Sequence, residues 1–84
     1  MYEIVFDPEA IEFLRKLDKK LAKRIWDKVL SAKADPHHFF ERLTDRNDYK
    51  LRVGDYRVIA DIDDSLERIE ITLIGHRKNI YRKI

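Results

Sequence analysis

The sequence predicts an α+β domain with the element order β-α-α-β-β-β, in which a helical hairpin packs on one face of an antiparallel four-stranded sheet. Three observations support this prediction. Alternating apolar residues flank the dipeptide Gly54-Asp55, a second alternating segment runs from Arg68 to Ile74, and residues 8–34 carry apolar side chains at helical spacing. Because the chain has 84 residues, we expect one domain over residues 1–84 with one small core.

The first expected element is a strand over residues 2–6, in which Tyr2, Ile4 and Phe6 share one face. Asp7 is a favourable N-cap, and Pro8 fits the first helical position because its missing N–H needs no partner there. A helix should therefore begin directly after the strand. Propensity leaves open whether the strand pairs antiparallel with the second strand or lies at an edge of the sheet.

The helical region divides at Asp18, which can cap a second helix. The apolar stripe of that helix contains Leu21, Ile25 and Val29. One continuous kinked helix is the alternative, because no glycine or proline enforces the break. Pro36 should end the helical region near Ala34, since the residue before a proline avoids the α conformation.

Basic residues cover the other side of these helices. They are Arg15, Lys16, Lys19, Lys20, Lys23, Arg24 and Lys28. Because they lie opposite the apolar stripe and are interspersed with Glu12 and Asp27, we interpret them as a solvated surface. Contact with phosphate groups is the alternative interpretation.

The connection over residues 37–48 is long enough to indicate either a function or a short element within it. We expect Phe39, Phe40 and Leu43 to pack against the core. His37 and His38 have no third ligand at a spacing typical of metal sites, so we expect neither a metal site nor a cofactor.

The stretch from Tyr49 to Ile62 should be a β-hairpin with the two-residue turn Gly54-Asp55. The implied pairs are Val53 with Tyr56, Arg52 with Arg57, Leu51 with Val58 and Lys50 with Ile59. The expected core face contains Tyr49, Leu51, Val53, Tyr56, Val58, Ala60 and Ile62. The opposite face then carries Lys50, Arg52 and Arg57. Like charges directly across a strand pair repel, so a neighbouring carboxylate or an external anion should neutralise them.

The last expected strand spans residues 68–74, with Ile69, Ile71 and Leu73 pointing inward, and it should pair with the preceding strand. Gly75 ends it. The basic segment that follows then brings four further candidate site residues to one end of the same sheet. They are His76, Arg77, Lys78 and Tyr81.

Composition narrows the function classes. The chain has no cysteine and no apolar run of the roughly 20 residues that a membrane span needs, so we expect a soluble cytoplasmic protein without a membrane partner. Its net charge is +2, so a nucleic-acid site must be a local patch. Arginine, lysine, histidine and tyrosine together are suited to bind a phosphodiester and to cleave RNA, whose 2′-hydroxyl is a built-in nucleophile.

Three blocks carry a resemblance to a known family. They read YKLR at residues 49–52, GDYRVI at 54–59 and IGHRKNIY at 74–81. These blocks resemble the signature of RelE-type toxins in the RelE/ParE superfamily, and the preceding helical hairpin agrees with that fold. The resemblance implies a toxin of a type II toxin-antitoxin system, an endoribonuclease that enters the ribosomal A site and cuts mRNA. It also implies a cognate antitoxin that neutralises the toxin by wrapping across it.

The resemblance also implies roles for individual residues. Arg57 and Arg77 would stabilise the charge on the scissile phosphate. Tyr81 would stack on a base and orient the RNA, and Lys50 would be the leading candidate for the general base.

Arg52 and Lys78 would bind the RNA backbone. Some family members carry another lysine two positions before Lys50, where this chain has Asp48. This departure makes His76 an alternative general base, because histidine titrates near neutral pH. Two other hypotheses remain: a ParE-like inhibitor of DNA gyrase without enzymatic activity, and an inactive relative that only binds nucleic acid or protein.

Overall fold

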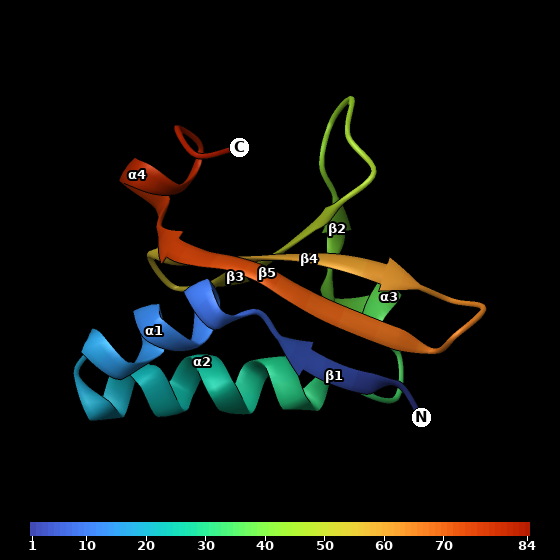
Figure 1. Ribbon diagram of the computed structural model, residues 1–84, viewed down its shortest axis with the longest axis horizontal. Helices are drawn as coiled ribbons and strands as arrows, with labels where there is room; N and C mark the ends of the chain where they lie inside the picture. Colours follow the sequence, from blue (N-terminus) through green and yellow to red (C-terminus); the bar gives the residue numbers. More distant parts are fainter.

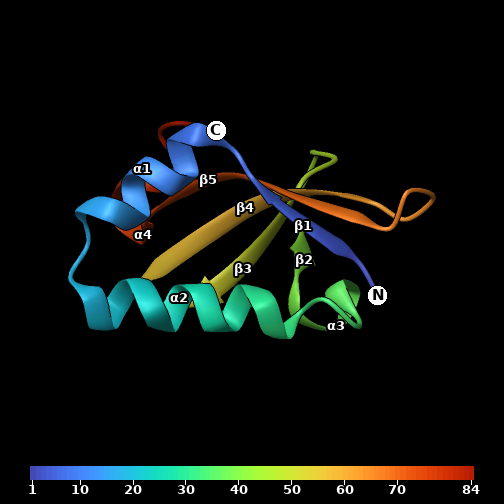
Figure 2. The same ribbon diagram turned by 60° about the horizontal axis from the view of Figure 1, so that its bottom comes forward.

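The computed structural model describes residues 1–84 as one sheet with helices on both of its faces (Figure 1). The elements are β1 (Glu3–Phe6), α1 (Pro8–Lys16), α2 (Lys19–Ser31), α3 (Pro36–Phe39), β2 (Glu41–Arg42), β3 (Tyr49–Val53), β4 (Tyr56–Asp63), β5 (Arg68–His76) and α4 (Arg77–Ile80). Helices α1 and α2 form a hairpin under one face, and α4 lies above the other (Figure 1). The turned view shows α2 running beneath β3 and β4 (Figure 2). The predicted α+β architecture with its helical hairpin is therefore confirmed.

The sheet differs from the prediction in two details. It is a mixed five-stranded sheet with the order β1-β5-β4-β3-β2, where an antiparallel four-stranded sheet was expected. Strand β1 lies at one edge and pairs parallel with β5, from Glu3 opposite Arg68 to Phe6 opposite Ile71. The alternation of side chains along a strand does not show whether that strand pairs parallel or antiparallel. Here the helical hairpin carries the chain from β1 at one edge of the sheet to β2 at the other edge, and β1 pairs parallel with β5.

The two helices start where the sequence places them. Asp18 caps α2 with its carboxylate, which accepts hydrogen bonds from the backbone N–H groups of Lys20 at 3.1 Å and Leu21 at 3.4 Å. Asp7 precedes α1 without a side-chain capping bond. The break at Asp18 is thus confirmed against one continuous helix, although α2 ends at Ser31, earlier than the expected end near Ala34.

The connection after α2 contains two short elements, α3 and β2. Phe40 is buried in the core, and Phe39 packs against it. β2 pairs antiparallel with the first two residues of β3 and supplies the fifth strand. Its two residues are too few to show an alternating pattern, so the sequence gives no signal for it.

The central hairpin has the predicted register, including Arg52 opposite Arg57 and Leu51 opposite Val58. Gly54 has a φ of 57°, a left-handed conformation that glycine adopts without steric cost. Val58 lies in the core beneath the sheet, so alternation places Arg57 on the other face, which we call the open face.

A β-bulge changes the pattern of β5. Ala60 pairs with Ile71 and Ile59 pairs with Leu73, so Thr72 is an extra residue without a partner. The Thr72 hydroxyl donates a hydrogen bond to the carbonyl of Ile59 at 3.2 Å. The prediction that Leu73 points inward is therefore wrong, because the extra residue turns Leu73 onto the open face.

Two apolar clusters result. The main core lies between the helical hairpin and the sheet, and it is centred on Ile25, Val29, Leu51, Val58, Ile69 and Ile71. The smaller cluster lies on the open face, where Ile80 of α4 covers Ile59 and Leu73. Helix α4 thus leaves only part of that face free for a ligand. No helix combines the length and the apolar character that crossing a membrane requires.

Candidate functional site

Two candidate arginines meet at the hairpin turn. Arg57, of β4, is only 9% exposed, and its Nη1 donates hydrogen bonds of 2.9 Å to the carbonyls of Gly54 and Tyr56. Arg77, at the start of α4, donates its backbone N–H to the carbonyl of Asp55 at 2.8 Å. Its Nε also lies 3.7 Å from the Asp55 carboxylate. The turn therefore holds two cations that come from different elements.

Gly75 makes this arrangement possible. It pairs with Arg57 across the sheet, and a Cβ added at Gly75 would lie 2.8 Å from Cδ1 of Ile80. Any side chain here would displace Ile80 and with it α4. The glycine thus allows α4 to fold back over the sheet end and keeps Arg77 beside the turn.

His76 lies on the other face. It pairs with Tyr56, and the two rings meet edge to face at a centroid distance of 5.2 Å. Tyr56 in turn contacts Phe13 of α1, so this pair belongs to the helical side of the sheet. The structure therefore does not bring His76 together with Arg57.

The imidazole of His76 also has a structural role. Its Nδ1 accepts a hydrogen bond of 3.1 Å from the backbone N–H of Lys78 and caps α4. A neutral imidazole that accepts through Nδ1 carries its proton on Nε2. His76 therefore has no free lone pair in this state, and acting as a general base would require breaking the bond to Lys78.

Lys50 lies farther along the open face. It is three residues before Val53, the last residue of β3, which corresponds to about 10 Å of strand. Its ammonium is 3.8 Å from the carboxylate of Glu41 on β2, and its side chain is one-third exposed. Arg52 lies between Lys50 and the turn and is exposed. The open face thus carries a lysine at one end and the two arginines at the other.

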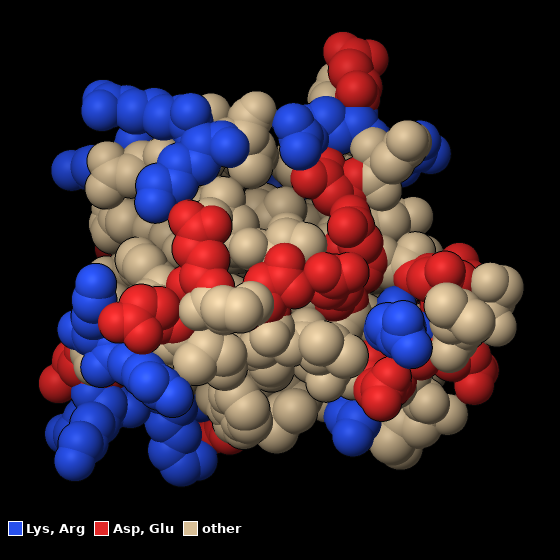
Figure 3. All heavy atoms as spheres, in the orientation of Figure 1, with Lys and Arg blue, Asp and Glu red and all other residues tan.

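The remaining candidates lie in and after α4. Lys78 is exposed, and Tyr81, which directly follows the helix, is 47% exposed. An aromatic ring with that exposure is available for stacking on a base. Basic side chains gather over α4 and over the α1–α2 end of the helical hairpin, with a band of acidic side chains between them (Figure 3).

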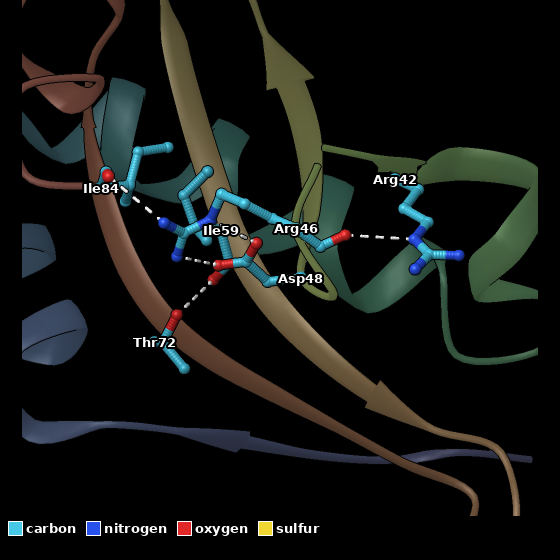
Figure 4. Close-up of polar contacts among 6 residues, drawn as sticks. All are labelled: Arg42, Arg46, Asp48, Ile59, Thr72 and Ile84. Carbon is cyan, nitrogen blue, oxygen red and sulfur yellow. Dashed lines mark hydrogen bonds and ion pairs between the residues drawn. The ribbon is translucent and has the colours of Figure 1, made fainter. Parts of the chain in front are cut away.

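The sequence interpretation missed Arg46. Its guanidinium forms a two-pronged ion pair with Asp48, with both N–O distances 2.8 Å, and its Nη1 donates to the carbonyl of Ile84 at 3.2 Å (Figure 4). The hydrogen bond to Arg46 lowers the pKa of Asp48, and the pKa of Arg46 is raised in return. Arg46, held in place by Asp48, thus ties the long loop to the end of the chain. The opposite charges of Arg46 and Asp48, two residues apart, were the signal in the sequence that could have indicated this ion pair.

The two histidines of α3 take part in no metal-binding cluster, and no group of three or more suitable side chains occurs elsewhere. His37 Nε2 lies 2.8 Å from the carboxylate of Asp64, which also accepts a hydrogen bond of 2.7 Å from the hydroxyl of Tyr2. This bond raises the pKa of Tyr2 to about 12 and, with the bond to His37, lowers the pKa of Asp64. These contacts join α3, the N-terminal segment and the β4–β5 turn.

A family model described as the ParE toxin of the type II toxin-antitoxin system parDE matches residues 4–81. The chain belongs to the RelE/ParE toxin superfamily. It is 34% identical over 86 residues to the toxin RelE of Mycobacterium tuberculosis, covering 96% of this chain and 87% of that protein. It is 31% identical over 88 residues to RelE4 of Methanocaldococcus jannaschii, covering 99% and 94%. The chain is therefore a RelE-type toxin, as the sequence blocks indicated.

Solved structures share the fold of this RelE-type toxin. The crystal structure of the RelBE2 toxin-antitoxin complex of Mycobacterium tuberculosis matches with a TM-score of 0.80 at 23% identity, covering 90% of this chain and 98% of that one. The isolated Escherichia coli RelE toxin matches over the full length of both chains with a TM-score of 0.74 at 18% identity. The mixed sheet with its helical hairpin is thus the fold of RelE toxins.

Proposed function

We propose that this RelE-type toxin is a ribosome-dependent endoribonuclease that cleaves mRNA in the A site. The observation that carries the proposal is the convergence of Arg57 and Arg77 on the Gly54–Asp55 turn, on a face that also carries Lys50. Arginine suits phosphate because its planar guanidinium binds two oxygens at once. The exposed ring of Tyr81 follows Arg77 within the same segment and supports a role in stacking.

Cleavage needs no cofactor. The ribose 2′-oxygen loses its proton and attacks the adjacent phosphorus, the bond from phosphorus to the 5′-oxygen breaks, and a proton is delivered to that leaving oxygen. The pentavalent intermediate carries more negative charge than the diester, so cations aimed at it accelerate the step.

The side chain of Arg77 is half exposed and is held only by its ion pair with Asp55. Once that pair separates, its guanidinium is free to contact the pentavalent phosphate. Lys50 is the candidate base, and it would have to leave Glu41 and give up its proton first. His76 remains the second candidate for the general base, but it would first have to break its hydrogen bond with the backbone N–H of Lys78.

A cognate antitoxin is the expected protein partner. Several neighbours in fold are toxin-antitoxin complexes, among them RelB-RelE of Methanococcus jannaschii, which matches with a TM-score of 0.74 at 20% identity. We propose that this chain is likewise held inactive in the cytoplasm by an antitoxin, and that its target is the ribosome with its mRNA.

The second candidate function is inhibition of DNA gyrase without catalysis. The specific observation in its favour is that the matching family model is the one for ParE toxins. The arginine pair with Tyr81 favours RNA cleavage instead, because a protein that only binds gyrase needs no charge stabilisation at a reacting phosphate.

Single-turnover cleavage of mRNA on programmed ribosomes tests the proposal. Arg77→Ala should lower the rate by about 100-fold or more, in the range of single electrostatic stabilisers, while ribosome affinity changes little. Tyr81→Ala should lower the rate more than Tyr81→Phe, because the phenylalanine keeps the stacking surface. Lys16→Ala, an exposed charge outside the site, is the control.

A parental rate for Arg77→Ala would refute the charge-stabilising role. A parent protein that leaves mRNA intact and inhibits gyrase would establish the second candidate in place of the first.

A further inference from the structure

A second basic site lies between α2 and the end of the β3–β4 hairpin, and it shares only Arg52 with the open face. It is a groove with a volume of about 800 Å³. Its basic lining residues are Lys20, Lys23, Arg24, Lys28 and Arg52. Asp27 is the one carboxylate in the lining, and it is bonded to Lys23 at 2.7 Å. The other four cations have no acidic side chain within ion-pairing distance, so the groove attracts an anion.

The lining of the groove excludes an apolar occupant. Val53 is its only hydrophobic residue, so an amphipathic helix would find no surface on which to bury an apolar face. The groove also meets an open sheet edge, because β2 pairs only with Tyr49 and Lys50 of β3. A polar, negatively charged strand is the kind of ligand that this lining suits.

The basic residues of α2 are evenly spaced. Lys20, Arg24 and Lys28 follow one another at intervals of four residues, so they share one side of the helix and lie about 6 Å apart along its axis. That interval is similar to the distance between successive phosphates of a single nucleic-acid strand. Each of the three cations can therefore meet one phosphate of the same strand.

The groove is continuous with the candidate site at Gly54. The guanidinium nitrogens of Arg24 lie 3.2 and 3.3 Å from the position that a Cβ on Gly54 would occupy. The carbonyl of the same glycine accepts a hydrogen bond from Arg57. The cations of α2 and the arginines of the site thus meet at one turn.

We infer that this α2 groove binds the sugar-phosphate backbone of a single RNA strand and guides that strand toward the turn where Arg57 and Arg77 meet. The choice of RNA over an acidic protein segment rests on the proposed function. Binding is electrostatic, so it depends on the salt concentration and is indifferent to base sequence.

The test uses the full-length chain and a short fluorescein-labelled oligouridylate with 2′-O-methyl groups, which cannot be cleaved. Its dissociation constant is measured by fluorescence anisotropy between about 50 and 200 mM KCl. Loss of three phosphate contacts in the triple variant Lys20→Ala, Arg24→Ala, Lys28→Ala should reduce the slope of log K against log salt by about 2. The triple variant Arg15→Ala, Lys16→Ala, Lys19→Ala removes the same charge from outside the groove and should keep the parental slope.

All six positions are exposed, so both variants should fold, and equal thermal midpoints would show it. Equal slopes for the parent and the groove variant would overturn the inference. So would a groove variant that keeps RNA binding but loses binding to a polyglutamate peptide, since the groove would then serve an acidic protein. A parent that shows groove-dependent binding yet cleaves no mRNA would refute the proposed function and leave the inference standing.

Discussion

At the scale of single residues, Arg57 shows how one side chain can serve both fold and site. It is a buried arginine whose hydrogen bonds go to the backbone carbonyls of Gly54 in the turn and Tyr56 directly after it, while Arg77 reaches the same turn from a half-exposed position. The two arginines look equivalent in the sequence, but their surroundings differ in solvent access. Their contributions to stability should differ accordingly.

We expect Arg57→Ala to lower the free energy of unfolding by about 1–3 kcal/mol, because it leaves carbonyls at a partly buried site without their donor. Arg77→Ala should cost about 0.5 kcal/mol or less, since its ion pair with Asp55 is exposed. Urea denaturation with a common m-value measures both. Equal losses would show that Arg57 is not what holds the turn.

At the scale of elements, the two helices of the hairpin begin with the same residue type but in different chemical settings. Asp18 bonds two backbone N–H groups of α2. The side chain of Asp7 bonds no backbone N–H group of α1. It hydrogen-bonds with the side chain of Glu70, and this raises the pKa of Glu70. A residue of the type preferred at an N-cap can thus use its side chain for another contact and leave the helix uncapped.

Asp18→Ala should therefore destabilise the protein by about 1 kcal/mol, the usual value of a lost N-cap bond. Asp7→Ala should cost less at neutral pH, because it also removes a carboxylate beside Glu70. Thermal denaturation of both variants compares them directly. A larger loss for Asp7→Ala than for Asp18→Ala would contradict this assignment of the two caps.

At the scale of the whole molecule, Arg46 and Asp48 fasten the loop after β2 to the final residue of the chain, across the outer side of β4. The side chain of Asp48 is 12% exposed, while its partner Arg46 stays partly exposed, so solvent reaches the ion pair from the side of the arginine. The connection joins segments 38 residues apart. It should therefore affect global stability in a pH-dependent way.

Because the pKa of Asp48 is lowered in the folded state, the folded protein holds this carboxyl ionised more readily than the unfolded chain does. The resulting stability is present above the ordinary carboxyl pKa of about 4, and it is lost as the pH falls through the lowered value. Asp48→Asn should be less stable than the parent at pH 7, and the gap should close in acid. A pH-independent gap would assign the loss to packing.

The sequence predicted best what local chemistry determines. The turn at Gly54, the cap at Asp18 and the register of the central hairpin follow from neighbouring residues, and all three are confirmed. The bulge at Thr72 could not be predicted, because it arises from pairing between β4 and β5 and the alternation from Ile69 to Leu73 continues through it without a break.

The candidate site shows the same division. The residue types of the site, and the position of Arg77, Lys78 and Tyr81 directly after the last strand, are visible in the sequence. The sequence could not show that His76 faces α1, which depends on the β-bulge in β5, or that Lys50 meets Glu41, which depends on the two-residue strand β2. The basic residues of α2 appeared as a solvated surface for a related reason: the groove forms only when β3 lies beside them.

The parallel pairing of β1 with β5 sets an order of events during synthesis. Residues 3–6 leave the ribosome first, yet their partners are residues 68–71, and closing so long a loop is slow and entropically costly. Until β5 has emerged, Ile4 and Phe6 have no sheet to join, and the helical hairpin has no complete surface to cover. The ribosome that synthesises this toxin is therefore not exposed to a folded copy of it until residues 68–71 have been translated.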